Sequence, residues 1–129
     1  MLLALDISTS CTGYCIFDED KLIDIGSINL SKHKGLFDKA TQVKLDIVKM
    51  YKKYDITHVV VEENLQAFRP GLSSAKTLMT LAQFNGVVRW ICHESLSVPV
   101  ESINVNTARK SVGLKINKKD KSKSTKEKV

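Results

Sequence analysis

Two acidic side chains stand where apolar, strand-like runs end, and they are the residues best placed to do chemistry. Asp6 follows the apolar run at 2–5 and precedes a turn of small hydroxyl residues. Glu62 follows the valines at 59–61 and is itself followed by Glu63. A carboxylate at the end of a buried strand needs a compensating partner, because an unpaired buried charge is strongly disfavoured.

Two interpretations of these carboxylates are open. Asp6 could accept hydrogen bonds from the amides and hydroxyls of the turn after it, and Glu62 and Glu63 could be plain surface charges. Alternatively, Asp6 and Glu62 hold a divalent ion, since neighbouring carboxylates raise each other's pKa unless a cation lies between them. Oxygen ligands without cysteine or histidine favour Mg²⁺, with Mn²⁺ as a second choice. Paired ions of this kind support phosphodiester hydrolysis.

The apolar periodicity predicts the elements that position these acids. Three strands with short connections come first and should be antiparallel, and two more strands, each reached through a helix, should be parallel. The expected elements are strands at 2–7, 12–18 and 22–30, a helix at 36–54, a strand at 57–63, a helix at 74–93, a strand at 98–103 and a short helix near 107–112. The fold class is therefore α/β, with a five-stranded mixed sheet and helices on both faces. The first and fourth strands lie side by side, so Asp6 and Glu62 meet at one end of the sheet.

The helix at 74–93 has only a narrow polar face, so it is either central to the domain or shared with a partner. Gly86 lies inside this helix, where it costs roughly 1 kcal/mol relative to alanine. Close approach of another backbone would offset this cost.

The positive charge is concentrated at the C-terminal end. The 129 residues carry a net charge of +6, and residues 115–129 contribute seven lysines against two acidic side chains. Residues 1–114 are nearly neutral and form the expected single domain, whereas residues 115–129 are expected to be a basic flexible tail. The tail could contact nucleic acid or be only a solvated end.

Other features of the sequence exclude several classes of protein. No apolar run approaches the roughly 20 residues that span a bilayer, and no basic segment precedes the first apolar run as in a signal peptide. The three cysteines form no C-x-x-C pair and the three histidines are scattered, so no zinc site is expected. These features predict a reduced, cytoplasmic protein without membrane contact.

Several motifs, in the same order along the chain, resemble those of RuvC-type Holliday junction resolvases. The run Leu-Asp-Ile-Ser-Thr-Ser-Cys-Thr-Gly-Tyr at 5–14 is similar to the first hairpin of that family, whose pattern is Asp-Pro-Gly-Ser, two residues, then Thr-Gly-Tyr. Val-Val-Val-Glu-Glu-Asn at 59–64 resembles the strand with the second carboxylate, and Leu-Ala-Gln-Phe-Asn-Gly-Val at 81–87 resembles a Leu-Gly-Gln-x-x-Gly helix. Val-Pro-Val at 98–100 and Arg-Lys-Ser-Val-Gly at 109–113 resemble the next strand and a basic helix.

The resemblance implies an RNase H-like fold and a magnesium-dependent endonuclease that cuts branched DNA such as four-way junctions, usually as a homodimer. It makes Asp6 and Glu62 the catalytic metal ligands, and Glu63 is less suitable because the family's acid directly follows the apolar run. Phe68 could stack on an unpaired base, although ordinary packing is its favoured role. The family's aromatic residue sits about where Leu65 is in this sequence, so Phe68 does not match it position for position. The resemblance does place the following residues where the family contacts the DNA backbone: Arg109, Lys110, Lys118, Lys119 and Lys121.

The sequence departs from the family's pattern in two places. Ile7 and Ser8 replace Pro-Gly in the first turn. The family also has a last helix with Asp-x-x-Asp or a histidine variant, for which Asp120 and Glu127 are poor substitutes. We therefore expect a C-terminally truncated piece of a longer phage or viral resolvase, which binds metal weakly and cuts DNA poorly or not at all.

Two other functions remain open at this point. The missing acids are consistent with a non-catalytic module that binds DNA junctions. A lobe of an actin-like or sugar-kinase ATPase also opens with an apolar strand, an aspartate and a phosphate-binding turn. Proteins of that group need two lobes and a much longer chain, so the nuclease is the favoured interpretation.

Overall fold

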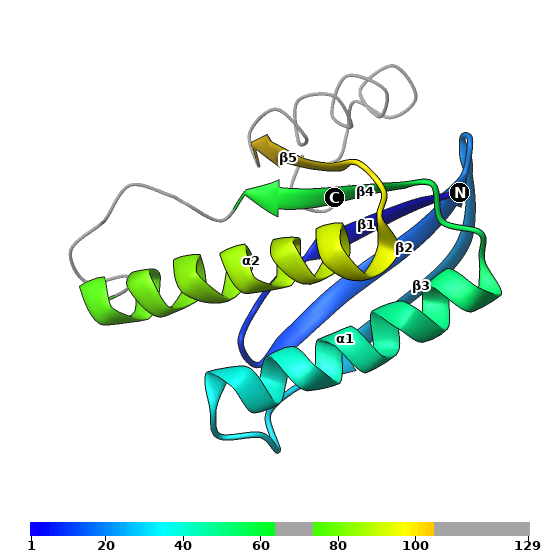
Figure 1. Ribbon diagram of the computed structural model, residues 1–129. Helices are drawn as coiled ribbons and strands as arrows, with labels where there is room; N and C mark the ends of the chain where they lie inside the picture. The colour runs from blue at the N-terminus through cyan, green and yellow to red at the C-terminus, as the bar shows by residue number, and fades with distance from the viewer. Residues whose placement is uncertain (64–73, 105–129) are drawn as a thin grey trace, which may run out of the picture.

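The computed structural model describes residues 1–63 and 74–104, which form one sheet and two helices (Figure 1). The elements are β1 (Leu2–Asp6), β2 (Cys11–Asp18), β3 (Lys21–Asn29), α1 (Leu36–Lys53), β4 (His58–Glu63), α2 (Ala75–Leu96) and β5 (Val100–Asn104). Each predicted element in this part of the chain is present. The short helix predicted near 107–112 lies outside the described residues. Neither described helix is long and apolar enough to cross a lipid bilayer.

The sheet has the predicted mixed pairing, with strand order β3-β2-β1-β4-β5. The pairs β1–β2 and β2–β3 are antiparallel, and the pairs β1–β4 and β4–β5 are parallel. β5 is an edge strand directly preceded by Pro99, in keeping with the tendency of proline to lie at sheet edges. The adjacency of β1 and β4 is the feature on which the predicted site depends.

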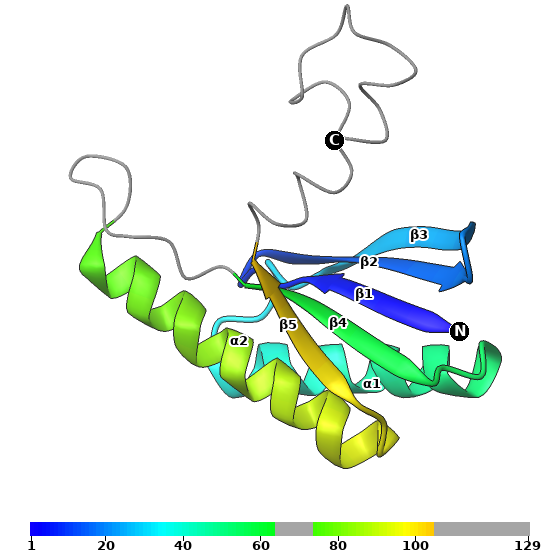
Figure 2. The same cartoon turned by 90° about the horizontal axis from the view of Figure 1, so that it is seen from above.

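The prediction of helices on both faces is wrong for the described part of the chain. Figure 2 shows α1 and α2 on the same side of the sheet, and the two helices contact each other. The reason lies in the direction of the connections. β3 runs parallel to β1 and β4, so the crossovers β3–α1–β4 and β4–α2–β5 both step in one direction across the sheet. Two right-handed crossovers in the same direction place their helices on the same face.

The hydrophobic core lies between this face of the sheet and the two helices. Alternate residues of β1 and β4 point into it, and Leu3, Leu5, Val59 and Val61 are almost fully buried. The predicted apolar stripe of α1 covers them with buried Ala40, Val43, Ile47 and Met50, and α2 contributes Phe84, Val88, Ile91, Cys92 and Leu96. The intervening residues of the strands therefore point to the other face, which neither α1 nor α2 covers.

The start of α2 agrees with the sequence and its end does not. Ser74 caps the helix, and its hydroxyl accepts a hydrogen bond from the Thr77 amide at 3.0 Å. The helix extends past the predicted end at residue 93 and ends at Leu96. It ends there because Ser97 takes the left-handed conformation at φ 53° and its amide donates a hydrogen bond to the His93 carbonyl.

Candidate functional site

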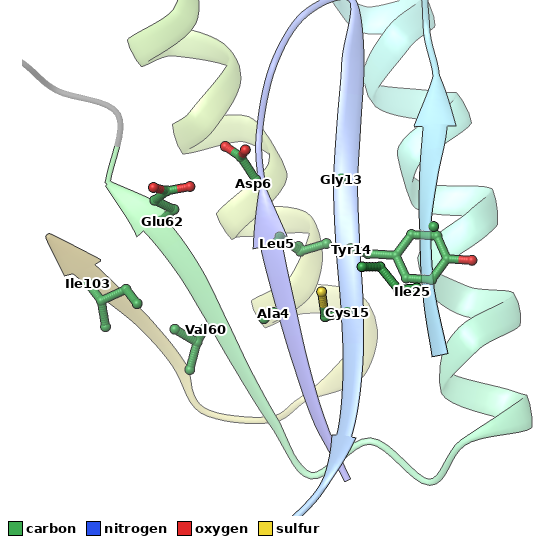
Figure 3. A pocket seen from close by; sticks show the side chains of 11 residues that line it. Ala4, Leu5, Asp6, Gly13, Tyr14, Cys15, Ile25, Val60, Glu62 and Ile103 are labelled. Carbon is green, nitrogen blue, oxygen red and sulfur yellow. The ribbon is translucent and has the colours of Figure 1, made fainter. Parts of the chain in front are cut away.

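The topology brings Asp6 and Glu62 together at one end of the sheet. Leu5 is opposite Val61 in the parallel β1–β4 pair, so the residue after each lies at the next step of the same register. Both acids alternate with buried core residues, which directs them to the face that the described helices leave open. Figure 3 shows the two carboxylates side by side at the ends of their strands.

The acids stand at the edge of a shallow depression of about 370 Å³ on this face. Its lining is otherwise mostly apolar and includes Ala4, Gly13, Val60 and Ile103. Gly13 is the antiparallel partner of Asp6, and a Cβ atom there would lie 3.9 Å from the Cβ of Asp6. Asp6 is exposed and Glu62 is half-buried, so the Asp6 carboxylate can be reached from this face.

Residues of the turn after Asp6 form hydrogen bonds with one another and not with the Asp6 carboxylate. The hydroxyls of Ser8 and Ser10 bond each other at 3.3 Å, and the Thr12 hydroxyl donates to the Ser8 carbonyl at 3.1 Å. Within residues 1–63 and 74–104, no turn amide or hydroxyl bonds the Asp6 side chain. The interpretation in which the turn hydrogen-bonds the Asp6 carboxylate is therefore not supported, and this carboxylate is exposed.

Two buried polar side chains fix the backbone beside the acids. Thr12 is fully buried, and its hydroxyl also accepts from the Ser8 amide at 3.4 Å, which holds the turn that follows Asp6. Asn85 of α2 is 7% exposed, and its amide donates to the backbone carbonyl of Glu62 at 3.4 Å. Among the described residues, these are the only polar residues that are buried. Each forms a hydrogen bond to the backbone at, or two residues from, one of the two acids.

Sequence reasoning missed the contribution of Thr12 and Asn85. The available signal was a polar residue inside each apolar element, Thr12 in β2 and Asn85 in α2. Because buried polar groups need hydrogen-bond partners, a polar residue at each of these positions indicates a specific hydrogen bond. Their partners could not be read from the sequence.

Glu63 is separated from Asp6 by the alternation of the strand. It follows Glu62 directly in β4, so the two side chains leave opposite faces of the sheet. Glu62 lines the depression with Asp6, and Glu63 does not. Of the two glutamates, Glu62 is therefore the one whose side chain lies on the same face of the sheet as Asp6.

The residues predicted to contact DNA lie outside the described part of the chain. These are Phe68, Arg109, Lys110, Lys118, Lys119 and Lys121. The predicted boundary between a domain at 1–114 and a tail at 115–129 lies there as well.

The donor chemistry of the site fits a hard divalent cation. Two neighbouring carboxylates supply oxygen ligands, which Mg²⁺ and Mn²⁺ prefer over softer metals. Among the described residues, no group of three or more His, Cys, Asp or Glu side chains gathers in a way that could hold a metal. The Asp6–Glu62 pair therefore supplies two carboxylate ligands and no third from the described residues.

The sheet order and pairing, together with helical crossovers, define an RNase H-like fold. No protein-family model matches the sequence, and a search of curated proteins finds no match. Solved structures do match. T. thermophilus RuvC in complex with a Holliday junction substrate superposes with a TM-score of 0.69 at 14% identity, covering 86% of this chain and 68% of that protein.

Two further structures agree with this match. The Thermus thermophilus RuvC structure gives a TM-score of 0.61 at 14% identity, covering 87% of this chain and 68% of that protein. The yeast mitochondrial Holliday junction resolvase gives 0.59 at 15% identity, covering 92% of this chain and 56% of that protein. The resemblance to RuvC-type resolvases that the motifs predicted is thus confirmed for the fold.

Proposed function

We propose that this protein is a divalent-metal-dependent endonuclease that acts on branched DNA and resolves four-way junctions by phosphodiester hydrolysis. The observation that carries the proposal is the meeting of Asp6 and Glu62 on the open face of an RNase H-like sheet. The similar RuvC structure is a complex with a Holliday junction substrate, which supports branched DNA as the substrate class.

The residues of the site have separate tasks in this proposal. Asp6 and Glu62 would hold Mg²⁺ or Mn²⁺, and such ions activate water and stabilise the leaving oxygen when bound. Thr12 and Asn85 keep the two acid-bearing backbones in place, so the carboxylates need little rearrangement. The exposure of Asp6 leaves room for a phosphodiester to approach from the open side of the sheet.

The proposal extends to DNA contacts and assembly. Arg109, Lys110, Lys118, Lys119 and Lys121 would neutralise backbone phosphates, and Phe68 is the candidate for stacking on a base. Such phosphate contacts give salt-sensitive affinity without sequence preference. A homodimer suits a symmetric four-way junction, because a two-fold axis presents one site to each of two equivalent strands.

A junction-cleavage assay tests the proposed chemistry. With a labelled four-way junction and Mg²⁺, Asp6→Asn and Glu62→Gln should each lower the cleavage rate on the order of 100-fold or more, because each removes a charged ligand. Glu63→Gln is the matched control, since the same change one residue along β4 affects the opposite face. Equal cleavage by all three variants would falsify the assigned roles of Asp6 and Glu62.

A binding measurement covers the case in which this chain cuts slowly. Mn²⁺ titration followed by electron paramagnetic resonance should show a site in the unaltered chain and in Glu63→Gln that both Asp6→Asn and Glu62→Gln weaken. If the chain instead bound junctions tightly, bound no Mn²⁺ and was unaffected by Asp6→Asn, it would be a non-catalytic junction-binding module.

A further inference from the structure

β3 forms one edge of the sheet that the described residues make, with β2 as its neighbour (Figure 2). With nine residues it is the longest described strand, and the side chains of Leu22, Ile23 and Ile25 are exposed. The Ile25 side chain is 65% exposed. A long apolar edge strand is a template on which another chain can add a strand, so proteins that keep such an edge block it.

The hydrogen bonds between β2 and β3 show which backbone groups of β3 point outward. The Leu30 amide donates to the Ser10 carbonyl at 2.9 Å, which adds one bonded pair to the end of the β2–β3 register. Bonded and non-bonded pairs alternate in an antiparallel ladder, so Asn29, Ser27 and Ile25 belong to non-bonded pairs. Their amides and carbonyls therefore point away from β2, toward the edge.

Asp24 occupies one of these outward amides. Its Oδ1 accepts a hydrogen bond from the Ile25 amide at 2.9 Å, and its Oδ2 accepts one from the Tyr54 hydroxyl, also at 2.9 Å. Tyr54 is the C-cap residue of α1, so the carboxylate connects the edge strand to the end of the helix. An incoming strand would have to displace Asp24 before it could bond the Ile25 amide.

We infer that Asp24, held in place by Tyr54, closes the β3 edge against pairing with a second copy of this chain. The edge fits a second copy, because an antiparallel pair of two β3 strands is self-complementary. Each copy would offer the same outward amides and carbonyls and the same exposed Ile25 side chain. While both oxygens of Asp24 are bonded, the Ile25 amide has no free hydrogen to donate to that strand.

The closed edge is separate from the site with the two acids. Neither Asp24 nor Tyr54 lines the depression beside Asp6 and Glu62. The inference therefore goes beyond the proposed function, and it stands or fails without any measurement of cleavage.

Amide hydrogen exchange, followed by NMR on the full chain, tests the bond to the edge. Asp24→Ala should raise the exchange rate of the Ile25 amide at least about tenfold after correction for the intrinsic rate, because a hydrogen bond to a charged acceptor has about that effect on an equilibrium. Tyr54→Phe should raise the rate about threefold, because the carboxylate keeps its charge but loses the hydroxyl that orients it.

Two matched controls remove the same groups from nearby positions. Asp46→Ala deletes a half-buried carboxylate that accepts from the Gln42 side chain within α1. Tyr51→Phe deletes the hydroxyl of an exposed tyrosine on the same helix. Neither change should alter exchange at Ile25. If Asp24→Ala fails to fold, as judged by circular dichroism, Tyr54→Phe provides the same test with the carboxylate retained.

Sedimentation without DNA or metal tests the consequence for assembly. At the same concentration, Asp24→Ala should form larger species than the unaltered chain, whereas Asp46→Ala should not. Adding Ser27→Pro to Asp24→Ala should restore the original size, because proline removes an outward donor of the edge and leaves the ladder with β2 intact.

Three results would overturn the inference. The first is exchange at Ile25 that neither Asp24→Ala nor Tyr54→Phe changes. The second is an Asp24→Ala chain that folds and forms no larger species. The third is association that persists when Ser27→Pro is added, since it would then arise from a surface other than the β3 edge.

Discussion

At the scale of single residues, the sheet end that carries the acids is organised by hydrogen bonds from buried side chains. Thr12 and Thr41 make equivalent bonds, since each hydroxyl donates to the carbonyl four residues earlier, at 3.1 Å and 3.0 Å. They differ in burial, because Thr12 is fully buried and Thr41 is exposed. The same chemical deletion can therefore be compared in two environments.

We expect Thr12→Val to lower the free energy of unfolding by about 1–3 kcal/mol. The substitution keeps the shape of the buried side chain but leaves the part-buried Ser8 carbonyl without its hydroxyl donor. Thr41→Val should stay within about 0.5 kcal/mol, because water replaces its exposed bond. Urea denaturation measures both changes, and equal losses in the two variants would contradict the assigned role of burial.

The sequence predicted some of these residues and not others for a physical reason. Asp6 and Glu62 could be found because each interrupts an apolar run, which is a local pattern. The bond from Asn85 to the Glu62 carbonyl joins residues that are 23 positions apart. Such a contact depends on how α2 packs against β4, and no local pattern reports it.

At the scale of elements, the strand order could be derived from the sequence and the helix faces followed from it. The three antiparallel strands and the two crossovers were all predicted, and handedness then places both described helices on one face. The expectation of helices on both faces did not take account of the shared direction of the two crossovers. This shared direction leaves the face with Asp6 and Glu62 uncovered by α1 and α2.

The periodicity of α2 could not distinguish core from surface. Apolar residues occur almost all round this helix, so its pattern does not single out a buried stripe. Phe84 and Val88 prove to be fully buried, whereas Met79 and Trp90 are exposed. Only the position of α1 beside α2 shows which side of the helix faces the core.

The β2–β3 pair depends on a glycine beneath an aromatic ring. Tyr14 is opposite Gly26 in this antiparallel pair, and a Cβ atom at Gly26 would lie 2.6 Å from the Tyr14 hydroxyl oxygen. We expect Gly26→Ala to cost about 1–3 kcal/mol, because the ring must move. Gly13→Ala should cost less, since its added Cβ would make an ordinary contact at 3.9 Å.

A double-mutant cycle separates this clash from a backbone effect. In a Tyr14→Ala background, Gly26→Ala should become neutral or stabilising by up to about 1 kcal/mol, since alanine restricts the unfolded chain. Urea denaturation of the four proteins gives the coupling energy. A penalty for Gly26→Ala that is unchanged by the loss of Tyr14 would show that the backbone, and not the ring, requires glycine.

At the scale of the whole molecule, the sheet separates two surfaces. Asp6 and Glu62 line the depression on the face that α1 and α2 leave uncovered. The two helices lie on the other side of the sheet (Figure 2). The proposed chemistry therefore uses one face of the sheet, and the packing of α1 and α2 uses the other.

The uneven distribution of charge along the sequence predicts which lysines contribute most to DNA binding. Residues 115–129 account for most of the net charge of +6, so the proposed phosphate contacts are concentrated at one end of the sequence. Lys118, Lys119 and Lys121 belong to this cluster. Replacing all three by glutamine should weaken binding to a labelled four-way junction. It should also reduce the slope of log K against log salt by up to about 2.7, because each phosphate contact contributes about 0.9.

Fluorescence anisotropy between low and moderate salt, with Ca²⁺ in place of Mg²⁺, measures this slope. The matched control replaces Lys34, Lys49 and Lys52, which are exposed at or near α1 and remove the same charge from the helical side of the molecule. If DNA approaches the open face, the control should keep nearly the original slope, because its charges lie on the far side of the sheet. An equal reduction in both triple variants would instead indicate that net charge alone, and not the C-terminal lysines, determines the affinity.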